Sequence, residues 1–155
     1  LRLVGSEMCI RDRNTHMKHT FEQKVYYSDT DAYGVVWHGS YLRWLEMGRV
    51  EYCEDLGLNL IELEKQDIVM PVTNMNIRYK ASGRLNDIVV VDTWIKKITP
   101  VTVVFEQTIK NKDSGKLFIQ AEFEVVAIRN NGSLHRRMPE VLKNAFEKVL
   151  SSCPV

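Results

Sequence analysis

Residues 38–56 carry a broad apolar stripe with the spacing of an α-helix. Apolar and small residues recur at intervals of one, three and four positions, and on a helical wheel they cover about half of the circumference. The stripe comprises Tyr41, Leu42, Trp44, Leu45, Gly48, Tyr52, Cys53 and Leu56. Gly57 follows its last member, where a helix commonly ends. A stripe this wide predicts a helix embraced by a concave surface rather than one resting on a flat surface.

Alternation of apolar and polar residues predicts strands on both sides of this helix. The predicted strands span residues 20–28, 74–80, 87–98, 101–110 and 117–127. The last three follow one another across short turns, which favours an antiparallel meander. A short helix at residues 60–65 and a terminal helix beginning at Pro139 complete the pattern. This order of elements indicates an α+β fold with the long helix packed on one face of the sheet.

Length and charge indicate one ordinary globular domain. The chain has 155 residues and 21 basic against 20 acidic side chains, so it lacks the charge excess of a nucleic-acid-binding protein. No apolar run reaches the roughly 18 residues of a transmembrane segment. The three cysteines are far apart and form neither a metal-binding spacing nor a disulfide framework. We therefore expect no metal site and a reducing, cytoplasmic location.

Residues 1–16 differ from the rest of the chain. They show no sustained helical or strand period, and they lack the apolar core of a signal peptide. They resemble translated adapter sequence, so we expect an extraneous or disordered segment there. A single domain is expected over residues 17–155, starting at Met17.

The segment that leads into the long helix carries the candidate chemistry. Asp29 and Asp31 are followed by a turn containing Gly34 and then by His38 at the expected helix start. A helix N-terminus offers free backbone N–H groups that stabilise negative charge, and a nearby carboxylate could attack a carbonyl or activate water. Either aspartate could instead be an ordinary helix cap, an interpretation that fits Asp29 better than Asp31. The sequence contains no nucleophile elbow, Walker A loop, dinucleotide-binding glycine pattern or zinc-protease motif.

A family resemblance gives this segment a specific meaning. Tyr27, residues 31–38, Tyr41 and residues 46–49 resemble the acyl-CoA thioesterases of the 4-hydroxybenzoyl-CoA thioesterase family, and its YbgC-like branch in particular. The resemblance covers roughly residues 18–150. It implies the hot-dog fold, in which a curved antiparallel sheet wraps a long central helix, here with a C-terminal helix added. It also implies a homodimer or homotetramer with active sites between subunits.

The resemblance implies roles for individual residues. Asp31 matches the catalytic carboxylate, acting as nucleophile or general base, and the His38 backbone N–H matches the group that polarises the thioester carbonyl. The His38 side chain and Tyr27 match positions that orient the carboxylate, water or substrate. His38 stands where the aromatic-substrate branch has tyrosine, which argues against hydroxybenzoyl-CoA. Tyr33 stands where the YbgC-like branch often has glycine, so its ring is expected to narrow or line the acyl pocket.

Further residues are expected to bind the substrate. Around the turn these are Tyr33, Gly34, Val35 and Trp37. The CoA phosphates require cations, for which the leading candidates are Arg78, Lys80 and Arg84. Each of these cations could equally be an ordinary solvated charge. No separate cofactor is implied, because CoA is part of the substrate and its thiolate is a good leaving group.

Hydrolysis of a short- to medium-chain acyl-CoA is the function that these features favour. The main alternative is a protein of the same fold that binds acyl-CoA or acyl carrier protein without cleaving it, or an envelope-associated scaffold. A hot-dog dehydratase also pairs a histidine with an acid, but its motif differs from the spacing of Asp31 and His38. The carboxylate and histidine at the helix entry favour the enzyme.

Overall fold

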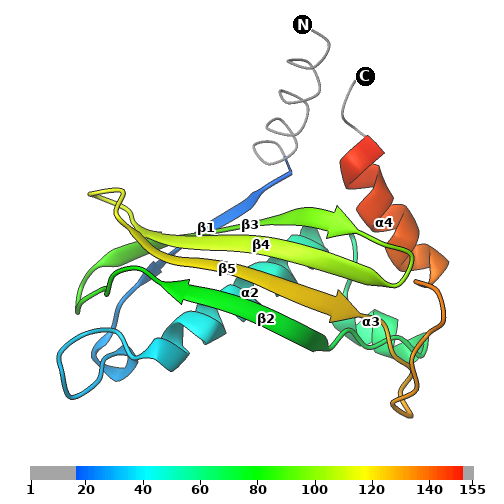
Figure 1. Ribbon diagram of the computed structural model, residues 1–155, viewed down its shortest axis with the longest axis horizontal. Coiled ribbons are helices and arrows are strands. Elements are labelled where there is room, and N and C mark those ends of the chain that lie inside the picture. The colour runs from blue at the N-terminus through cyan, green and yellow to red at the C-terminus, as the bar shows by residue number, and fades with distance from the viewer. Residues whose placement is uncertain (1–16, 152–155) are drawn as a thin grey trace, which may run out of the picture.

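The computed structural model describes residues 17–151, and the expectation for residues 1–16 lies outside them. One antiparallel sheet has the strand order β1-β3-β4-β5-β2. The strands are β1 (His19–Lys24), β2 (Val72–Tyr79), β3 (Ile88–Ile98), β4 (Thr102–Asn111) and β5 (Leu117–Val126). The other elements are the 3₁₀ turn η1 (Tyr27–Asp29) and the helices α2 (His38–Asp55), α3 (Leu60–Lys65) and α4 (Glu140–Ser151). Figure 1 shows α2 lying along one face of the curved sheet, with α4 beyond one end of the strands.

The broad stripe of α2 is buried against the sheet, as its width predicted. The buried residues of the helix are Ser40, Tyr41, Trp44, Leu45, Gly48, Tyr52 and Cys53. Trp44 and Leu45 are fully inaccessible, as is Ile109 of β4 in the same core cluster. Full burial of such side chains contributes about 1.5–3 kcal/mol each. The predicted meander is also confirmed, because β3, β4 and β5 are neighbours in the sheet.

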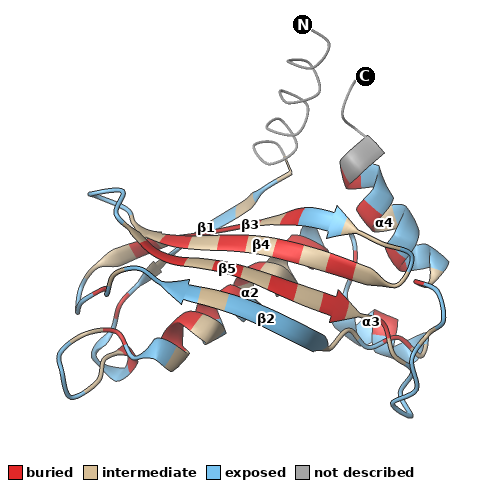
Figure 2. Cartoon of the chain, in the orientation of Figure 1, coloured by how far each residue is buried: buried red, intermediate tan, exposed pale blue. Residues whose placement is uncertain are grey.

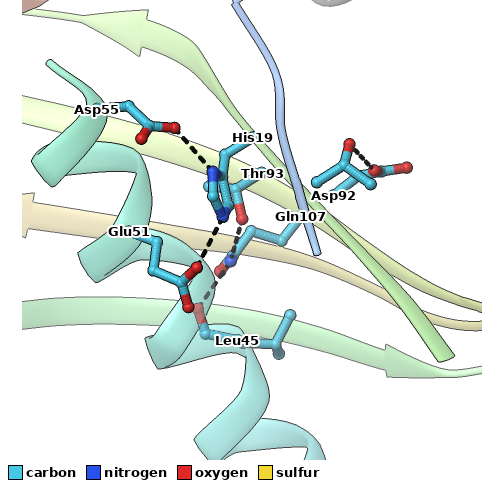
Figure 3. Close-up of polar contacts among 8 residues, drawn as sticks. His19, Leu45, Glu51, Asp55, Asp92, Thr93 and Gln107 are labelled. Atoms are coloured by element: carbon cyan, nitrogen blue, oxygen red, sulfur yellow. Dashed lines mark hydrogen bonds and ion pairs between the residues drawn. The ribbon is translucent and has the colours of Figure 1, made fainter. Parts of the chain in front are cut away.

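Gly48 marks a close approach of α2 to the sheet. A β-carbon at this position would lie 2.5 Å from Oγ1 of Thr93 and 3.0 Å from Nε2 of Gln107. The Gln107 amide is fully buried and donates hydrogen bonds to the carbonyl oxygen of Leu45 (2.8 Å) and to Oγ1 of Thr93 (2.7 Å), as Figure 3 shows. The missing side chain at Gly48 therefore lets one buried amide join the helix to the sheet.

His19 ties β1 to the C-terminal half of α2. Its Nδ1 lies 2.8 Å from Oδ2 of Asp55, and its Nε2 lies 3.2 Å from Oε1 of Glu51 (Figure 3). The two carboxylates are four residues apart, so they lie one above the other on the same side of the helix. A single imidazole therefore holds the first strand against two turns of α2.

β2 is more exposed than the half-buried strand that its alternation predicted. Met75 is 53% exposed and Tyr79 is 49% exposed, and Figure 2 shows the pale colour of exposed residues along most of the strand. The reason is its place in the sheet. Within residues 17–151, β2 pairs with β5 and has no strand on its other side. No helix of the described chain is long and apolar enough to cross a membrane.

Candidate active site

Asp29 fixes the segment between β1 and α2. Its buried carboxylate accepts hydrogen bonds from the backbone N–H of Tyr26 (2.9 Å) and from the guanidinium of Arg43 (2.6 Å). Its carbonyl oxygen accepts from the N–H of Trp37 (2.8 Å) and from the hydroxyl of Ser40 (3.0 Å). These bonds turn the chain into η1, so the first strand ends at Lys24 rather than at the predicted residue 28. Asp29 is thus a structural anchor, which sequence reasoning left open as a cap.

Asp31 lies in a tight turn between Asp29 and the helix. Thr30 and Val36 form an isolated antiparallel bridge, which closes the turn. The N–H of Gly34 donates to the carbonyl oxygen of Asp31 (3.0 Å), and Gly34 has a φ of 77°, which favours glycine. Oδ1 of Asp31 accepts from the N–H of Tyr33 (2.9 Å). The turn therefore holds the carboxylate in one orientation through one of its two oxygens.

The carboxylate of Asp31 is only partly buried and faces a cavity. This cavity of about 520 Å³ is lined by Tyr27, Thr30, Asp31, Ala32, Gly34 and Leu85. Tyr27 is 81% exposed and Tyr33 is 90% exposed, so both rings are accessible at the surface around the turn. The structure thus brings Tyr27, Asp31 and Gly34 together, as the predicted site requires.

The N-terminus of α2 follows this turn directly. The helix begins at His38, and Trp37 at the cap position makes no side-chain capping hydrogen bond among the described residues. The first N–H groups of a helix have no partner within the helix, and the helix dipole is positive at this end. The start of α2 therefore offers backbone donors for a developing negative charge, close in sequence to the Asp31 carboxylate.

Aromatic rings surround His38. The exposed imidazole lies 5.0 Å from the ring of Trp37 and 6.5 Å from the ring of Tyr79, measured between centroids. The Tyr79 hydroxyl donates a 3.2 Å hydrogen bond to the carbonyl oxygen of His38. Sequence reasoning missed Tyr79, because its alternation with polar neighbours marked it only as a strand residue. Burial raises the pKa of the Tyr79 phenol above its usual value, at which the hydroxyl is already protonated at neutral pH.

Tyr41 joins the first turn of α2 to the loop before β3. Its hydroxyl accepts a 2.8 Å hydrogen bond from the N–H of Gly83. Burial raises the pKa of Tyr41, and the bond to Gly83 opposes that rise. Next to Gly83, Arg84 forms an isolated antiparallel bridge with Val35. Two of the residues predicted to bind substrate, Val35 and Arg84, are therefore neighbours at the edge of the site.

The remaining predicted cations, Arg78 and Lys80, lie at the end of β2 and just after it. Arg78 pairs with Gln120 in the sheet and lines a separate polar pocket, together with Asn76 and Lys96, on the face opposite the buried residues of β5. Lys80 follows the end of β2, and its N–H donates to the carbonyl oxygen of Phe118. The fold of one chain therefore brings Arg84, but not Arg78, to the Asp31 turn. Within the described residues, no cluster of three or more histidine, cysteine or acidic side chains could hold a metal ion.

Comparison with known proteins identifies the class. Residues 33–118 match the family model "4HBT: Thioesterase superfamily". The match spans more than half of the 155 residues, so the chain belongs to this superfamily of thioester hydrolases. The predicted family and the predicted hot-dog fold are both confirmed.

Individual relatives narrow the class. The chain is 31% identical over 125 residues to the acyl-CoA thioester hydrolase YbgC of Escherichia coli O6:H1, an alignment that covers 81% of this chain and 92% of that protein. It is 37% identical over 89 residues to the acyl-CoA thioesterase YbgC of Haemophilus influenzae, covering 57% and 65% of the two chains. Among solved structures, a DHNA-CoA thioesterase from Staphylococcus aureus superimposes with a TM-score of 0.79 at 31% identity, covering 86% and 91% of the two chains.

Proposed function

We propose that this protein hydrolyses acyl-CoA thioesters to the free acid and CoA, with Asp31 as the reacting carboxylate. One observation carries the proposal: a partly exposed carboxylate faces a cavity in the turn that leads into α2, whose N-terminus has no side-chain cap. The relatives named as acyl-CoA thioesterases supply the substrate class. A thioester needs a nucleophile and a site for the oxyanion, and the turn and the helix start offer one of each.

In the proposed complex, the thioester carbonyl oxygen lies at the start of α2. The backbone N–H of His38 donates to this oxygen, and the helix dipole favours the negative charge that develops on it. One such donor typically lowers the barrier by about 3 kcal/mol. The His38 side chain and Tyr27 orient the carboxylate, the water molecule or the substrate.

Asp31 can act by either of two routes. As a nucleophile, its oxygen attacks the thioester carbon, the C–S bond breaks, CoA leaves as the thiolate, and water then hydrolyses the mixed anhydride. As a general base, it takes a proton from the water molecule that attacks the same carbon. A single turnover in H₂¹⁸O identifies the nucleophilic route when water attacks the Asp31 carbonyl of the anhydride, because an unlabelled Asp31 oxygen then leaves with the acid and ¹⁸O enters the enzyme. If ¹⁸O enters only the product acid, trapping with hydroxylamine separates the routes, because only the nucleophilic route forms an anhydride that hydroxylamine can intercept.

Short- to medium-chain acyl groups are the proposed substrates. The cavity beside Asp31 has a volume of about 520 Å³, and the exposed ring of Tyr33 belongs to the turn that carries Asp31, although it is not part of the cavity lining. For the CoA phosphates we favour Arg84, which forms a bridge with Val35, over Arg78 on the other face of the sheet. Arg84→Ala should therefore raise KM more than Arg78→Ala does.

The direct test is a panel of acyl-CoA substrates of increasing chain length, with a thiol-reactive dye reporting free CoA. Saturable release of CoA, with a maximum at short or medium chains, supports the proposal. Binding of acyl-CoA or acyl carrier protein without release of a thiol would support the non-hydrolytic alternative instead.

A homodimer or homotetramer is proposed with this activity. The outer edge of β2 has no partner strand among residues 17–151, and a cavity of about 370 Å³ beside it is lined by apolar residues that include Val50, Leu60 and Val72. An unpaired, partly apolar edge is a natural surface for a second copy. Light scattering at micromolar concentration tests the proposal, and a monomer would contradict it.

A cytoplasmic location is proposed as well, because Cys53 is a free buried thiol. Cell fractionation with an antibody against the protein tests this location.

A further inference from the structure

Tyr79 links the edge strand β2 to the first turn of α2. It is the last residue of β2 and lies opposite Ile119 of β5, which is completely buried beneath the helix. Its ring therefore faces the same side of the sheet as α2. There its hydroxyl reaches the carbonyl oxygen of His38 at 3.2 Å, and its ring meets the imidazole of His38 edge-on, at 6.5 Å and 86°.

The contacts of Tyr79 gather at the first turn of α2. Its second aromatic contact is with Tyr41, at 6.0 Å and 62°. With 49% of its surface exposed, Tyr79 buries much less area than a core tyrosine such as Tyr41, which is 2% exposed. A carbonyl oxygen has two lone pairs, so that of His38 can accept from Tyr79 as well as from the helix. One side chain thus contacts both the backbone and the imidazole of His38.

We propose that Tyr79 is a positioning residue, which sets the orientation of the His38 imidazole and holds the first peptide of α2 in place. The inference rests on the proposed thioesterase function, in which His38 acts through its imidazole and its backbone N–H. The carbonyl oxygen that Tyr79 binds belongs to the next peptide, between His38 and Gly39, so the hydroxyl restrains the N–H only through the His38 Cα. The hydroxyl of Tyr79 restrains the peptide whose oxygen it binds, and its ring restricts the rotation of the imidazole. Tyr79 itself touches neither the carboxylate of Asp31 nor the reacting carbonyl in this scheme.

The first test separates the hydroxyl from the ring by steady-state kinetics. Tyr79→Phe removes the hydroxyl alone, and loss of one hydrogen bond predicts a decrease in kcat of about fivefold. Tyr79→Leu also removes the edge-on contact and should lower kcat by about tenfold or more. KM should change little in both variants, because the contacts are to the catalytic group and not to substrate. Met75→Leu is the matched control, since Met75 lies four residues earlier on the same side of the same exposed strand.

A double-mutant cycle with His38→Ala tests whether the Tyr79 ring acts through the imidazole. Without the imidazole, the additional loss from Tyr79→Leu relative to Tyr79→Phe should disappear, whereas the loss from Tyr79→Phe should remain because the backbone carbonyl is still present. Equal losses from the ring in both backgrounds, or an equal loss from Met75→Leu, would overturn the inference.

A spectroscopic measurement tests the same inference without any substrate. The ¹H–¹³C resonances of the His38 ring are assigned by their absence from the His38→Ala spectrum. Tyr79→Leu should shift them, because a neighbouring aromatic ring is lost, while Tyr79→Phe and Met75→Leu should leave them nearly in place. Unmoved His38 resonances in Tyr79→Leu would contradict the positioning role even if the enzyme hydrolyses acyl-CoA. Shifted resonances in a protein that cleaves no thioester would support the contact and contradict only the proposed function.

Discussion

The guanidinium of Arg43 donates a 2.6 Å hydrogen bond to the buried carboxylate of Asp29, and this pair fastens the segment between β1 and α2 to the first half of that helix. The Asp29 carboxyl group is almost completely buried, whereas 59% of the Arg43 side chain is exposed. Arg43 therefore stabilises the turn mainly by donating a hydrogen bond to a carboxylate that is buried away from solvent.

Removing this pair should cost stability. Arg43→Ala leaves Asp29 with the N–H of Tyr26 as its remaining side-chain partner, and should lower the free energy of unfolding by about 1–2 kcal/mol, discounted for the exposure of Arg43. Asp29→Ala should cost at least as much. Chemical denaturation measures both effects. Arg43→Lys keeps the positive charge but not the planar guanidinium, so its stability should lie between that of the parent protein and that of Arg43→Ala. Unchanged stability in Asp29→Ala would show that the turn does not depend on this anchor.

Asp31→Asn distinguishes a reacting carboxylate from a helix cap. Asparagine caps a helix about as well as aspartate and can still accept from the N–H of Tyr33, so the melting temperature should change little. Loss of the nucleophile or base should reduce acyl-CoA hydrolysis by at least about a hundredfold. Mass spectrometry must exclude deamidation back to aspartate. An active Asp31→Asn enzyme would refute the proposed mechanism.

His38→Ala should reduce turnover less than Asp31→Asn does. The substitution removes an orienting imidazole but keeps the backbone N–H at the start of α2, which is the proposed oxyanion donor. Kinetics of the two variants side by side measure the difference. A loss at His38 that equals or exceeds the loss at Asp31 would mean that the two roles are assigned to the wrong residues.

Gly48→Ala should destabilise the protein although alanine favours helix formation. The gain in helix propensity is at most about 1 kcal/mol, whereas overpacking a core typically costs about 1–3 kcal/mol. The added methyl group would lie 2.5 Å from Oγ1 of Thr93, so a net loss of stability is expected by thermal melting. Adding Thr93→Ala makes room and should recover part of the loss. A Gly48→Ala variant more stable than the parent would show that the helix can move away from β3.

Cys53 should be inert to thiol reagents in the folded protein. Burial raises the pKa of its thiol to about 12, and the side chain is nearly inaccessible. In a Cys9→Ser/Cys153→Ser background at pH 8, labelling should follow global unfolding. The folded state holds the thiol proton of Cys53 more tightly than the unfolded state does. The contribution of this thiol to the free energy of unfolding is therefore complete below pH 9 and falls as pH rises from 9 towards 12. Rapid labelling under native conditions would contradict this burial.

The periodicity of apolar residues along the sequence predicted the individual helices and strands. The stripe around Trp44 and Gly48 predicted the central helix and its wide burial, and alternation predicted β3, β4 and β5. Alternation shows which side of a strand faces the core but not which strands are neighbours. The position of β2 at the outer edge beside β5, and the resulting exposure of Met75, were therefore not predictable from it.

The site was predictable only in part, for a similar reason. Asp29 and Asp31 look alike in the sequence, and their surroundings separate them. Arg43, 14 residues later, reaches Asp29, while Asp31 stays at the cavity. Tyr79 lies 41 residues beyond His38, and only the folded sheet brings it to the helix start. The family resemblance supplied the role of Asp31, which stays a prediction until the carboxylate is tested.

The placement of β2 also sets the order in which the site can be completed during synthesis. Among residues 17–151, β2 pairs only with β5, so Tyr79 gains its strand neighbour Ile119 after a further 40 residues have been made. The turn with Asp31 and the start of α2 emerge from the ribosome long before that. A nascent chain halted before β5 would therefore contain Asp31 and the start of α2 but would not hold Tyr79 beside His38. The complete site can form only after β5 has been synthesised.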